Sequence, residues 1–434
     1  MVNYINRIKR LFKESKIFNN ILTLFKGNVV VSVIGLINTA LLISALKMEK
    51  NGIIFMAQSY AMLFNSLFNF QSYSAVVRFV PRVMKDSKEK IIIYLKQGFF
   101  LDFTTALLGM VMAFVLLGPI SKLMKWDELV VNCMSIYIII ILFSTTGTMA
   151  GILRIYDKFK EAVYINLVEA LSKFILFIIG FKLKQGIYYF LIVEIISVAL
   201  AMLAFMWFSY KTIREQNLHF KNVKWKIDKE FFKFNLYSNL ETAADLPLQY
   251  ITPFIINAML GLSDITIYKV IEKVGALIYK VTYPISQAIF PDLSKRIAQD
   301  NLKAALGLHK KAKKIIFTLG SIIVVGATIT APLWLWILIP VTFKNVLAMS
   351  IYLAFVVFTN MFMALHSIFN LLGYIKKNIP IIVFANIIYL VILFKFAGMF
   401  GVIGVILSKI IQSVIVILSK EIILRKNNYR EIKI

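Results

Sequence analysis

Long apolar runs recur along the whole chain, and they constrain its fold more than any other feature. Each is long enough to cross roughly 30 Å of hydrocarbon as an α-helix rising about 1.5 Å per residue. The 434 residues are 59% hydrophobic and 16% charged, whereas soluble domains are closer to one half apolar and one quarter charged. The sequence therefore predicts an all-α polytopic membrane protein with about twelve spans. They are expected at residues 21–46, 52–80, 91–120, 129–153, 161–182, 186–210, 231–260, 265–291, 315–340, 345–373, 378–398 and 400–423.

The basic residues between these runs predict the orientation of the chain. Lys and Arg concentrate in alternate connections, and cytoplasmic connections carry the excess of positive charge in membrane proteins. The basic connections are 7–16, 82–90, 154–160, 211–233, 295–314, 376–377 and 420–433. This pattern predicts a multi-pass protein of the bacterial cytoplasmic membrane with both termini in the cytoplasm. The formal charge of +27 then indicates contact with anionic lipids and not with nucleic acid.

The longest polar stretch, 211–230, separates two sets of six spans. A faint internal repeat supports this division, because Gln71–Arg82 and Gln287–Arg296 are both polar runs that close at a proline followed by basic residues. Two similar helical bundles are a common plan for transporters. The predicted parts are an amphipathic N-terminal segment 1–20, an N-lobe 21–215, a cytoplasmic linker 216–230, a C-lobe 231–425 and a basic tail 426–434.

Three lysines of the expected eighth span fall on one side of the helix. Lys269, Lys273 and Lys280 share this face with Gln287, at about 100° per residue. Charges within a bilayer are costly, so they indicate a water-filled cavity with positive potential, which attracts an anion. In the alternative interpretation the outer lysines extend to the interfaces, and Lys273 pairs with Glu272 or with another helix.

The expected seventh span carries two carboxylates on a broad polar face. Glu241 and Asp245 are four residues apart and so adjacent on a helix. They are candidates for sharing a proton or holding Na⁺, because neighbouring like charges favour proton uptake. The alternative is that they provide counter-charge for the lysines of the next span. Asn239 and Gln249 extend the same polar face.

Amides also mark one side of the second span, at Gln58, Asn65 and Asn69. Amides suit sugar hydroxyls, and they also bind helices to one another. Arg78 lies near the cytoplasmic end of this span, where a phosphate contact and a headgroup contact are both compatible with its position.

Further ionisable residues occur in other spans. Glu169 and Lys173 are spaced for an ion pair within one helix. Glu194 has no partner nearby in sequence and is a second candidate for proton or ion coupling. His366 is expected to be a hydrogen-bonded packing residue more than a proton relay.

Several kinds of chemistry have no signal in this sequence. There is no Walker A motif, which would indicate an ATP-driven motor. Neither a Cys/His cluster nor HExxH suggests a metal, and with three histidines no Ser/His/Asp set stands out. The sequence therefore predicts neither an enzyme nor a cofactor.

Three stretches resemble the polysaccharide-transporter branch of the multidrug/oligosaccharidyl-lipid/polysaccharide (MOP) exporters, the O-antigen, capsule and teichuronic-acid flippases. Leu153–Lys173 is similar to the junction of that family's fourth and fifth helices. Leu262–Val274 resembles its link into the eighth helix, and Tyr283–Lys295 resembles the end of that helix. The family usually has Gly before the tyrosine, where this chain has Ile267 before Tyr268.

The resemblance implies two six-helix lobes around a central cavity that opens alternately to each side. It implies a polyprenyl-pyrophosphate-linked oligosaccharide as cargo, and coupling to H⁺ or Na⁺. Other polysaccharide-assembly proteins are candidate partners. Two alternatives stay open: an organic-cation or drug antiporter of the MATE type, and, from a different class, a membrane glycosyltransferase or polysaccharide polymerase.

Overall fold

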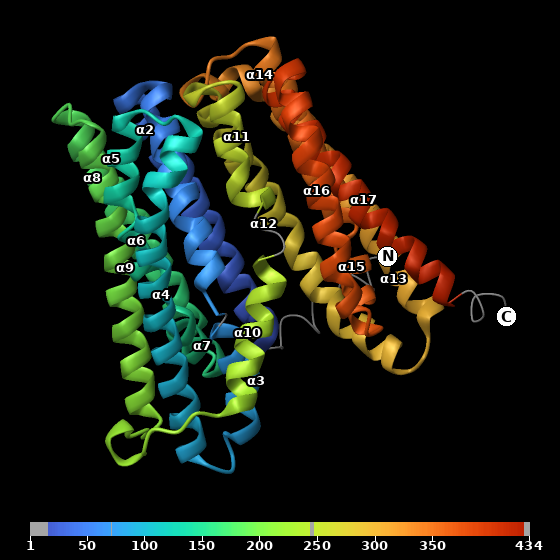
Figure 1. The fold of residues 1–434 in the computed structure, drawn as a ribbon. Coiled ribbons are helices and arrows are strands. Elements are labelled where there is room, and N and C mark those ends of the chain that lie inside the picture. The colour runs from blue at the N-terminus through green and yellow to red at the C-terminus, as the bar shows by residue number, and fades with distance from the viewer. Residues whose placement is uncertain (1–15, 71, 244–246, 429–434) are drawn as a thin grey trace. The chain divides into compact units, whose positions relative to one another are not determined.

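The computed structural model describes residues 16–70, 72–243 and 247–428, and every regular element in these ranges is a helix. The prediction of an all-α polytopic membrane protein is confirmed. The helices run in the order shown in Figure 1. They are α2 (Lys16–Phe68), α3 (Ser72–Val83), α4 (Lys88–Met124), α5 (Glu128–Tyr137), α6 (Ile140–Ser144), α7 (Gly147–Ile155), α8 (Phe159–Lys182), α9 (Ile187–Glu215), η1 (Phe220–Asn222), α10 (Lys229–Ala243), η2 (Pro247–Ile251), α11 (Thr252–Met259), α12 (Leu262–Ala298), α13 (Leu302–Trp334), η3 (Leu335–Ile337), α14 (Phe343–Met361), α15 (Met363–Leu371), α16 (Ile375–Phe400) and α17 (Val402–Asn428).

Nine helical runs in the described ranges are long and apolar enough to cross a membrane. One of them, Gly27–Val83, contains the first two predicted spans, which meet at a kink where Lys47 has φ 62° and ψ 171°. The predicted seventh and eighth spans correspond to α10–α11 and α12, which are not among the nine. Polar and charged residues interrupt the apolar surface of these helices, and these are the helices in which the sequence places most of the candidate site.

Several predicted spans are broken helices. The span expected at 129–153 consists of α5, α6 and α7, and the helix is interrupted at Thr145 and Thr146. The span expected at 345–373 consists of α14 and α15, which meet at Phe362. Broken helices leave backbone groups without intrahelical partners, and in lipid such groups must be met by other parts of the protein.

The chain forms two compact units that are not contiguous in sequence. Unit 1 comprises Met1–Ala45 and Tyr60–Ala243, and unit 2 comprises Leu46–Ser59 and Ala244–Ile434. The chain therefore passes from one unit to the other within α2 and again after α10. Each unit has its own hydrophobic clusters.

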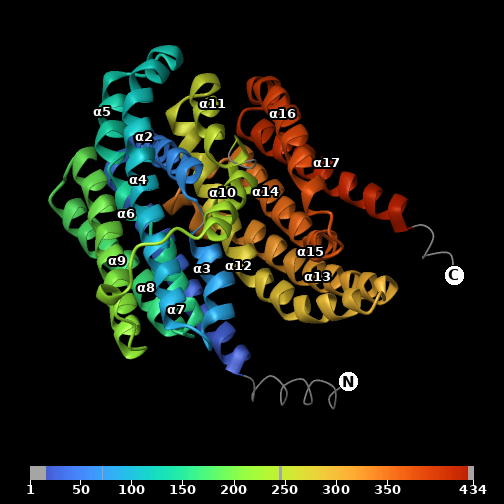
Figure 2. The same cartoon turned by 60° about the horizontal axis from the view of Figure 1, so that its bottom comes forward.

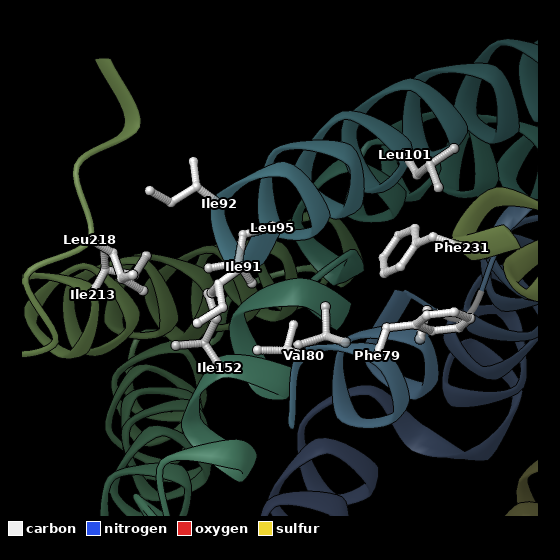
Figure 3. Close-up of a cluster of buried hydrophobic side chains, with 12 residues drawn as sticks. Phe79, Val80, Ile91, Ile92, Leu95, Leu101, Ile152, Ile213, Leu218 and Phe231 are labelled. Atoms are coloured by element: carbon white, nitrogen blue, oxygen red, sulfur yellow. The ribbon is translucent and has the colours of Figure 1, made fainter. Parts of the chain in front are cut away.

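The largest cluster of unit 1 joins helices from the first and last parts of that unit. Figure 3 shows side chains from α3, α4, α7, α9 and α10 converging, with Phe79 and Phe231 facing each other. The ring of Tyr94 stacks on Phe231, with centroids 5.3 Å apart. Gln97 of α4 donates to the carbonyl of Asp228 (3.1 Å) and accepts from its amide (3.0 Å). These contacts attach the start of α10 to α4.

Unit 2 is built around α12. Helices α13, α14 and α15 pack along it, and α16 and α17 run side by side (Figures 1 and 2). The short segment Leu46–Ser59 belongs here because Gly52 lies directly against the carbonyl of Leu262, and the Thr266 hydroxyl donates to the carbonyl of Met48 at 2.7 Å. A side chain at position 52 would collide with backbone at the start of α12.

Replacing Gly52 by Ala should destabilise unit 2, because the added methyl group meets the backbone carbonyl of Leu262 and not a side chain that can rotate away. We expect a loss of about 1–3 kcal/mol, as for other overpacked sites. Thermal unfolding of the purified protein in detergent measures it. Gly326→Ala is the matched control, since a methyl group there meets no atom within 4 Å and alanine favours the helix. Equal melting temperatures for both variants would contradict the close packing of Gly52.

Candidate functional site

An ion cluster at the start of α12 contains the best-defined charges of unit 2. The Glu272 carboxylate lies between two lysines, with Lys269 Nζ 2.9 Å from Oε2 and Lys409 Nζ 2.7 Å from Oε1. The Tyr268 hydroxyl donates to the same carboxylate at 2.8 Å. Two ammonium groups face one carboxylate, so the cluster has a net positive charge.

Lys409 is the residue of this cluster that sequence reasoning missed. It comes from α17, and its side chain is only 7% exposed, against 21% for Glu272. The signal was available, because Lys409 interrupts the apolar run Val402–Leu418 and an ionisable residue within a span marks a functional site or an ion pair. Its pairing with Glu272 joins α12 to α17, across 137 positions in sequence.

The three predicted lysines of α12 have different environments. Lys269 is paired with Glu272, the residue that the alternative interpretation assigned to Lys273. Lys273 Nζ lies 4.8 Å from the centroid of the Phe55 ring, over the face of an aromatic residue from the short segment of unit 2. Lys280 is partly exposed, two turns further along the helix.

Neutral polar pairs continue through unit 2 beyond the lysines. The Asn360 amide of α14 donates to the Thr282 hydroxyl of α12 at 2.7 Å, and both residues are buried. Gln412 of α17 donates to Asn386 of α16 at 3.0 Å. His366, in α15, lies 3.1 Å from Lys420 Nζ through its Nδ1 atom. The predicted role of His366 as a hydrogen-bonded packing residue agrees with this contact.

Unit 1 has a separate buried ion pair. Lys173 Nζ lies 3.4 Å from Glu194 and 3.7 Å from Glu169. The Tyr137 hydroxyl donates to the other oxygen of Glu194 at 3.0 Å. The predicted Glu169–Lys173 pair is therefore present. Glu194, which has no partner nearby in sequence, pairs with Lys173 of α8, the helix that precedes its own helix α9 and packs against it.

The amides of the second span take part in packing around the end of α2. Asn239 of α10 is buried, and its side-chain amide donates to the carbonyls of Leu67 (3.2 Å) and Asn69 (2.5 Å), just before α3 begins. The backbone amide of Asn69 donates to the carbonyl of Asn65. Asn239 thus satisfies backbone groups at a helix end, as polar residues do in membrane proteins.

Two further predicted site residues are exposed. The guanidinium of Arg78 lies 4.5 Å from the centroid of the Phe234 ring, within unit 1. Gln249 lies in the π-helical turn η2 of unit 2. Gln58 is partly buried in the short segment of α2 that belongs to unit 2.

Three predicted site residues are not described. Asp245 lies outside the described ranges, and the side chains of Glu241 and Gln287 are likewise undescribed. The candidate residues with described side chains divide between the two units. Lys269, Lys273, Lys280, Gln58 and Gln249 are in unit 2, and Arg78, Asn65, Asn69, Asn239 and Glu194 are in unit 1.

A buried aspartate of α4 also escaped the sequence reasoning. Asp102 is 6% exposed and accepts hydrogen bonds from the Ser72 hydroxyl and, at 2.8 Å, from the Thr148 backbone amide. Thr148 is in the first turn of α7, so Asp102 caps the broken helix from another part of the chain. A single aspartate in the apolar run 98–109 was the available signal. In the described ranges, no group of three or more His, Cys, Asp or Glu residues could hold a metal ion.

Comparison with known families decides the identity of the fold. A model of the polysaccharide biosynthesis protein family matches residues 17–297. The chain belongs to this family. The match covers unit 1 from residue 17 onward, the short segment of unit 2 and all but the last residue of α12, which includes the cationic part of that helix. The resemblance inferred from the sequence is confirmed, and a search of curated proteins gives no match.

Solved structures show the same fold at low sequence identity. An inward-facing multidrug resistance MATE transporter of the MOP superfamily is 15% identical with a TM-score of 0.70, over 93% of this chain and 94% of that one. A mutant MATE transporter from Vibrio cholerae is 13% identical with a TM-score of 0.67, over 95% and 96%. A MOP superfamily transporter from Pyrococcus furiosus, described as having a binding pocket of reversed polarity that suggests a different function, is 14% identical with a TM-score of 0.67, over 93% and 94%.

Removing the Glu272 carboxylate should strongly destabilise unit 2, because Lys409 would stay buried without its counter-charge. We expect Glu272→Gln to cost about 3–5 kcal/mol, as when one member of a buried ion pair is removed. Melting temperatures of the purified variants in detergent report the loss. Glu421→Gln is the control, since Glu421 pairs with an exposed Arg425 at 3.8 Å and exposed pairs contribute less than about 1 kcal/mol.

The double variant Glu272→Leu/Lys409→Met tests whether the loss of stability comes from the unpaired charge of Lys409 and not from the change of side chain at position 272. With both charges gone, most of the lost stability should return. A double variant as unstable as Glu272→Gln would contradict the pairing as the cause.

Proposed function

We propose that this membrane protein is a flippase that moves a polyprenyl-pyrophosphate-linked oligosaccharide across the bacterial cytoplasmic membrane by alternating access. Family membership and a fold shared with MATE transporters support a membrane transporter. The observation that carries the choice of cargo is the excess of cations in unit 2. Lys269, Lys273, Lys280 and Lys409 accompany Glu272 within α12 and α17.

A pyrophosphate group suits such a set of lysines. Ammonium groups hold phosphate as point charges without strict geometry, and low-dielectric surroundings strengthen the attraction. Lys273 and Lys280 lie on the same face of α12 as Lys269, and we expect them to meet the headgroup first. Glu272 then keeps its own pair of lysines in place while the cargo binds.

Arg78 is proposed as a second contact for phosphate or sugar. Arg78 is exposed, and its guanidinium carbon lies 4.5 Å from the centroid of the Phe234 ring, a distance at which a cation is attracted to the ring. Arginine binds phosphate through two parallel hydrogen bonds. The amides of Gln58 and Gln249 are the side chains that we assign to sugar hydroxyls. Asn239, Asn65 and Asn69 take part in the packing described above, within unit 1.

We also propose an orientation of the chain in the membrane and an energy source for transport. Both termini face the cytoplasm, anionic lipids contact the basic connections, and a gradient of H⁺ or Na⁺ drives the cycle. Other polysaccharide-assembly proteins would supply and receive the cargo. Glu194 is a coupling candidate that must release Lys173 to bind an ion, and Glu241 and Asp245 are candidates outside the described side chains.

The chief alternative cargo is an organic cation, as expected of a MATE-type antiporter. A cation site needs an excess of carboxylates, whereas the described part of α12 and α17 has an excess of lysines. The structurally similar transporter from Pyrococcus furiosus, described as having reversed pocket polarity and a different function, is a precedent for inverting charge on this fold. An assay that measures transport without product formation separates the flippase from a glycosyltransferase or polymerase.

Reversing the charge of Lys273 and Lys280 should abolish flipping, because two carboxylates would repel the pyrophosphate. We expect Lys273→Glu/Lys280→Glu to reduce the rate to background, and Lys273→Gln/Lys280→Gln to give an intermediate rate. The measurement is the transfer of a fluorescent, short-chain polyprenyl-pyrophosphate saccharide between leaflets of proteoliposomes. Lys122→Glu, at an exposed position near the end of α4, is the matched control.

The same proteoliposomes test the alternative. Uptake of a fluorescent organic cation by the wild type, with no movement of the lipid-linked saccharide, would replace the flippase by an antiporter. Normal flipping by the charge-reversed variant would remove these lysines from the site.

A further inference from the structure

Asp102 lies deep in the described part of α4. It is about 21 Å along the helix axis from Lys88, the first residue of α4, at about 1.5 Å per residue. The residue is 6% exposed, and its neighbours Leu101 and Thr105 are also buried. An ionised carboxylate at such a depth is unfavourable unless it is paired or hydrogen-bonded.

The partners of Asp102 among the described residues are all neutral. Its carboxylate accepts from the Ser72 hydroxyl of α3 and from the Thr148 amide of α7. Gly147 lies so close that a Cβ there would touch both Ser72 and Asp102. The positive end of the α7 helix dipole also favours the ionised form.

Glu194, which is also buried, and the half-buried Glu272 are neutralised by lysine. Glu194 pairs with Lys173, and Glu272 pairs with Lys269 and Lys409. A nearby ammonium group favours the ionised form of each of these two carboxylates, so each takes up a proton less readily. Asp102 differs because hydrogen bonds alone hold its charge, so one proton can neutralise it without leaving a lysine unpaired.

The structure also provides an acceptor for the protonated form. The Thr148 hydroxyl lies beside the Asp102 carboxylate but makes no hydrogen bond to any described atom, although it is buried. A neutral carboxyl group has an O–H to donate. Protonated Asp102 can donate to this hydroxyl, whereas ionised Asp102 accepts from the amide of the same residue.

Among the described residues, Asp102 forms no ion pair with a neighbouring helix. Arg78 and Arg154 lie about two turns beyond Ser72 and Thr148, and their guanidinium groups lie over Phe234 and Phe159. Lys96 donates to the carbonyl of Val223. α6 carries no titratable residue. Other titratable residues on these helices are Tyr60 of α2, which donates to Ala113, and Lys47, Glu49 and Lys50 of the same helix. α3 adds Tyr73 and Arg82, α5 adds Glu128, Cys133 and Tyr137, and α10 adds Lys229, Glu230, Lys233 and Tyr237.

We propose that Asp102 is a proton-binding site that couples transport to the proton gradient. In the ionised state, Ser72 and the Thr148 amide bind the carboxylate and hold α3 and α7 to α4. The carboxylate then takes one proton from water to give the neutral acid, and the charge-assisted bonds to α3 and to the start of α7 are lost. Release of the proton to water restores them. This inference rests on the proposed transport function, and it selects H⁺ as the coupling ion.

Infrared difference spectroscopy of the full-length protein in lipid tests the site without any cargo. We expect the carbonyl stretch of a protonated carboxyl group to grow as the pH falls, and to be missing from Asp102→Asn. The band should remain in Glu194→Gln, the matched control with another buried carboxylate removed. In Ser72→Ala the midpoint should move to higher pH, because the ionised form loses a donor. A band that is unchanged in Asp102→Asn, or no titrating band at all, would overturn the assignment.

Coupling is tested separately in proteoliposomes with the labelled polyprenyl-pyrophosphate saccharide. An imposed pH gradient should accelerate flipping by the wild type, and the rates with and without the gradient should become equal in Asp102→Asn and differ again in Asp102→Glu. If the band titrates but no saccharide moves, the cargo proposal fails and the proton site stands. If saccharide moves and Asp102→Asn still responds to the gradient, the proton site is not the coupling site.

Discussion

The cost of a charge in lipid governs how the ionisable residues of this protein are arranged. Lys269 and Lys409 each place Nζ within 2.9 Å of a Glu272 carboxylate oxygen, because none of these charges is stable alone in a medium of low dielectric constant. The pairing fixes α17 against α12 and leaves one positive charge in excess. The same three side chains thus join two helices of unit 2 and give this part of the unit a positive charge.

The carboxylates of unit 1 satisfy the same constraint in two ways. Glu194 has a lysine and a tyrosine hydroxyl, which hold it as an ion. Asp102 has a hydroxyl and a backbone amide at the start of a broken helix. The second arrangement also satisfies a backbone group that the break in the helix exposes. A helix interruption that would otherwise be costly in lipid therefore creates a place for a single exchangeable proton.

Much of the architecture could be predicted because it depends on local properties of the chain. Runs of apolar residues determine where helices cross the membrane, and the helices observed correspond to the predicted spans. The face shared by Lys269, Lys273 and Lys280 was also predictable, since helical periodicity alone sets it. The break between the first two spans was predicted at residues 47–51, and the helix kinks there at Lys47. The interruption near Thr145 was not predicted, because such breaks depend on neighbours that satisfy the freed backbone groups, such as Asp102.

The sequence by itself determined that this chain is helical, lies in a membrane and carries cations within its spans, because hydropathy and periodicity are properties of adjacent residues. Only the tertiary structure decided which of those charges are neutralised. Glu272 pairs with Lys409, 137 positions away in sequence, and Glu194 pairs with Lys173. Asp102 accepts hydrogen bonds from neutral donors. Ion pairing depends on a separation of a few ångströms in space and not on the separation along the chain. No local sequence pattern therefore predicts which residues pair.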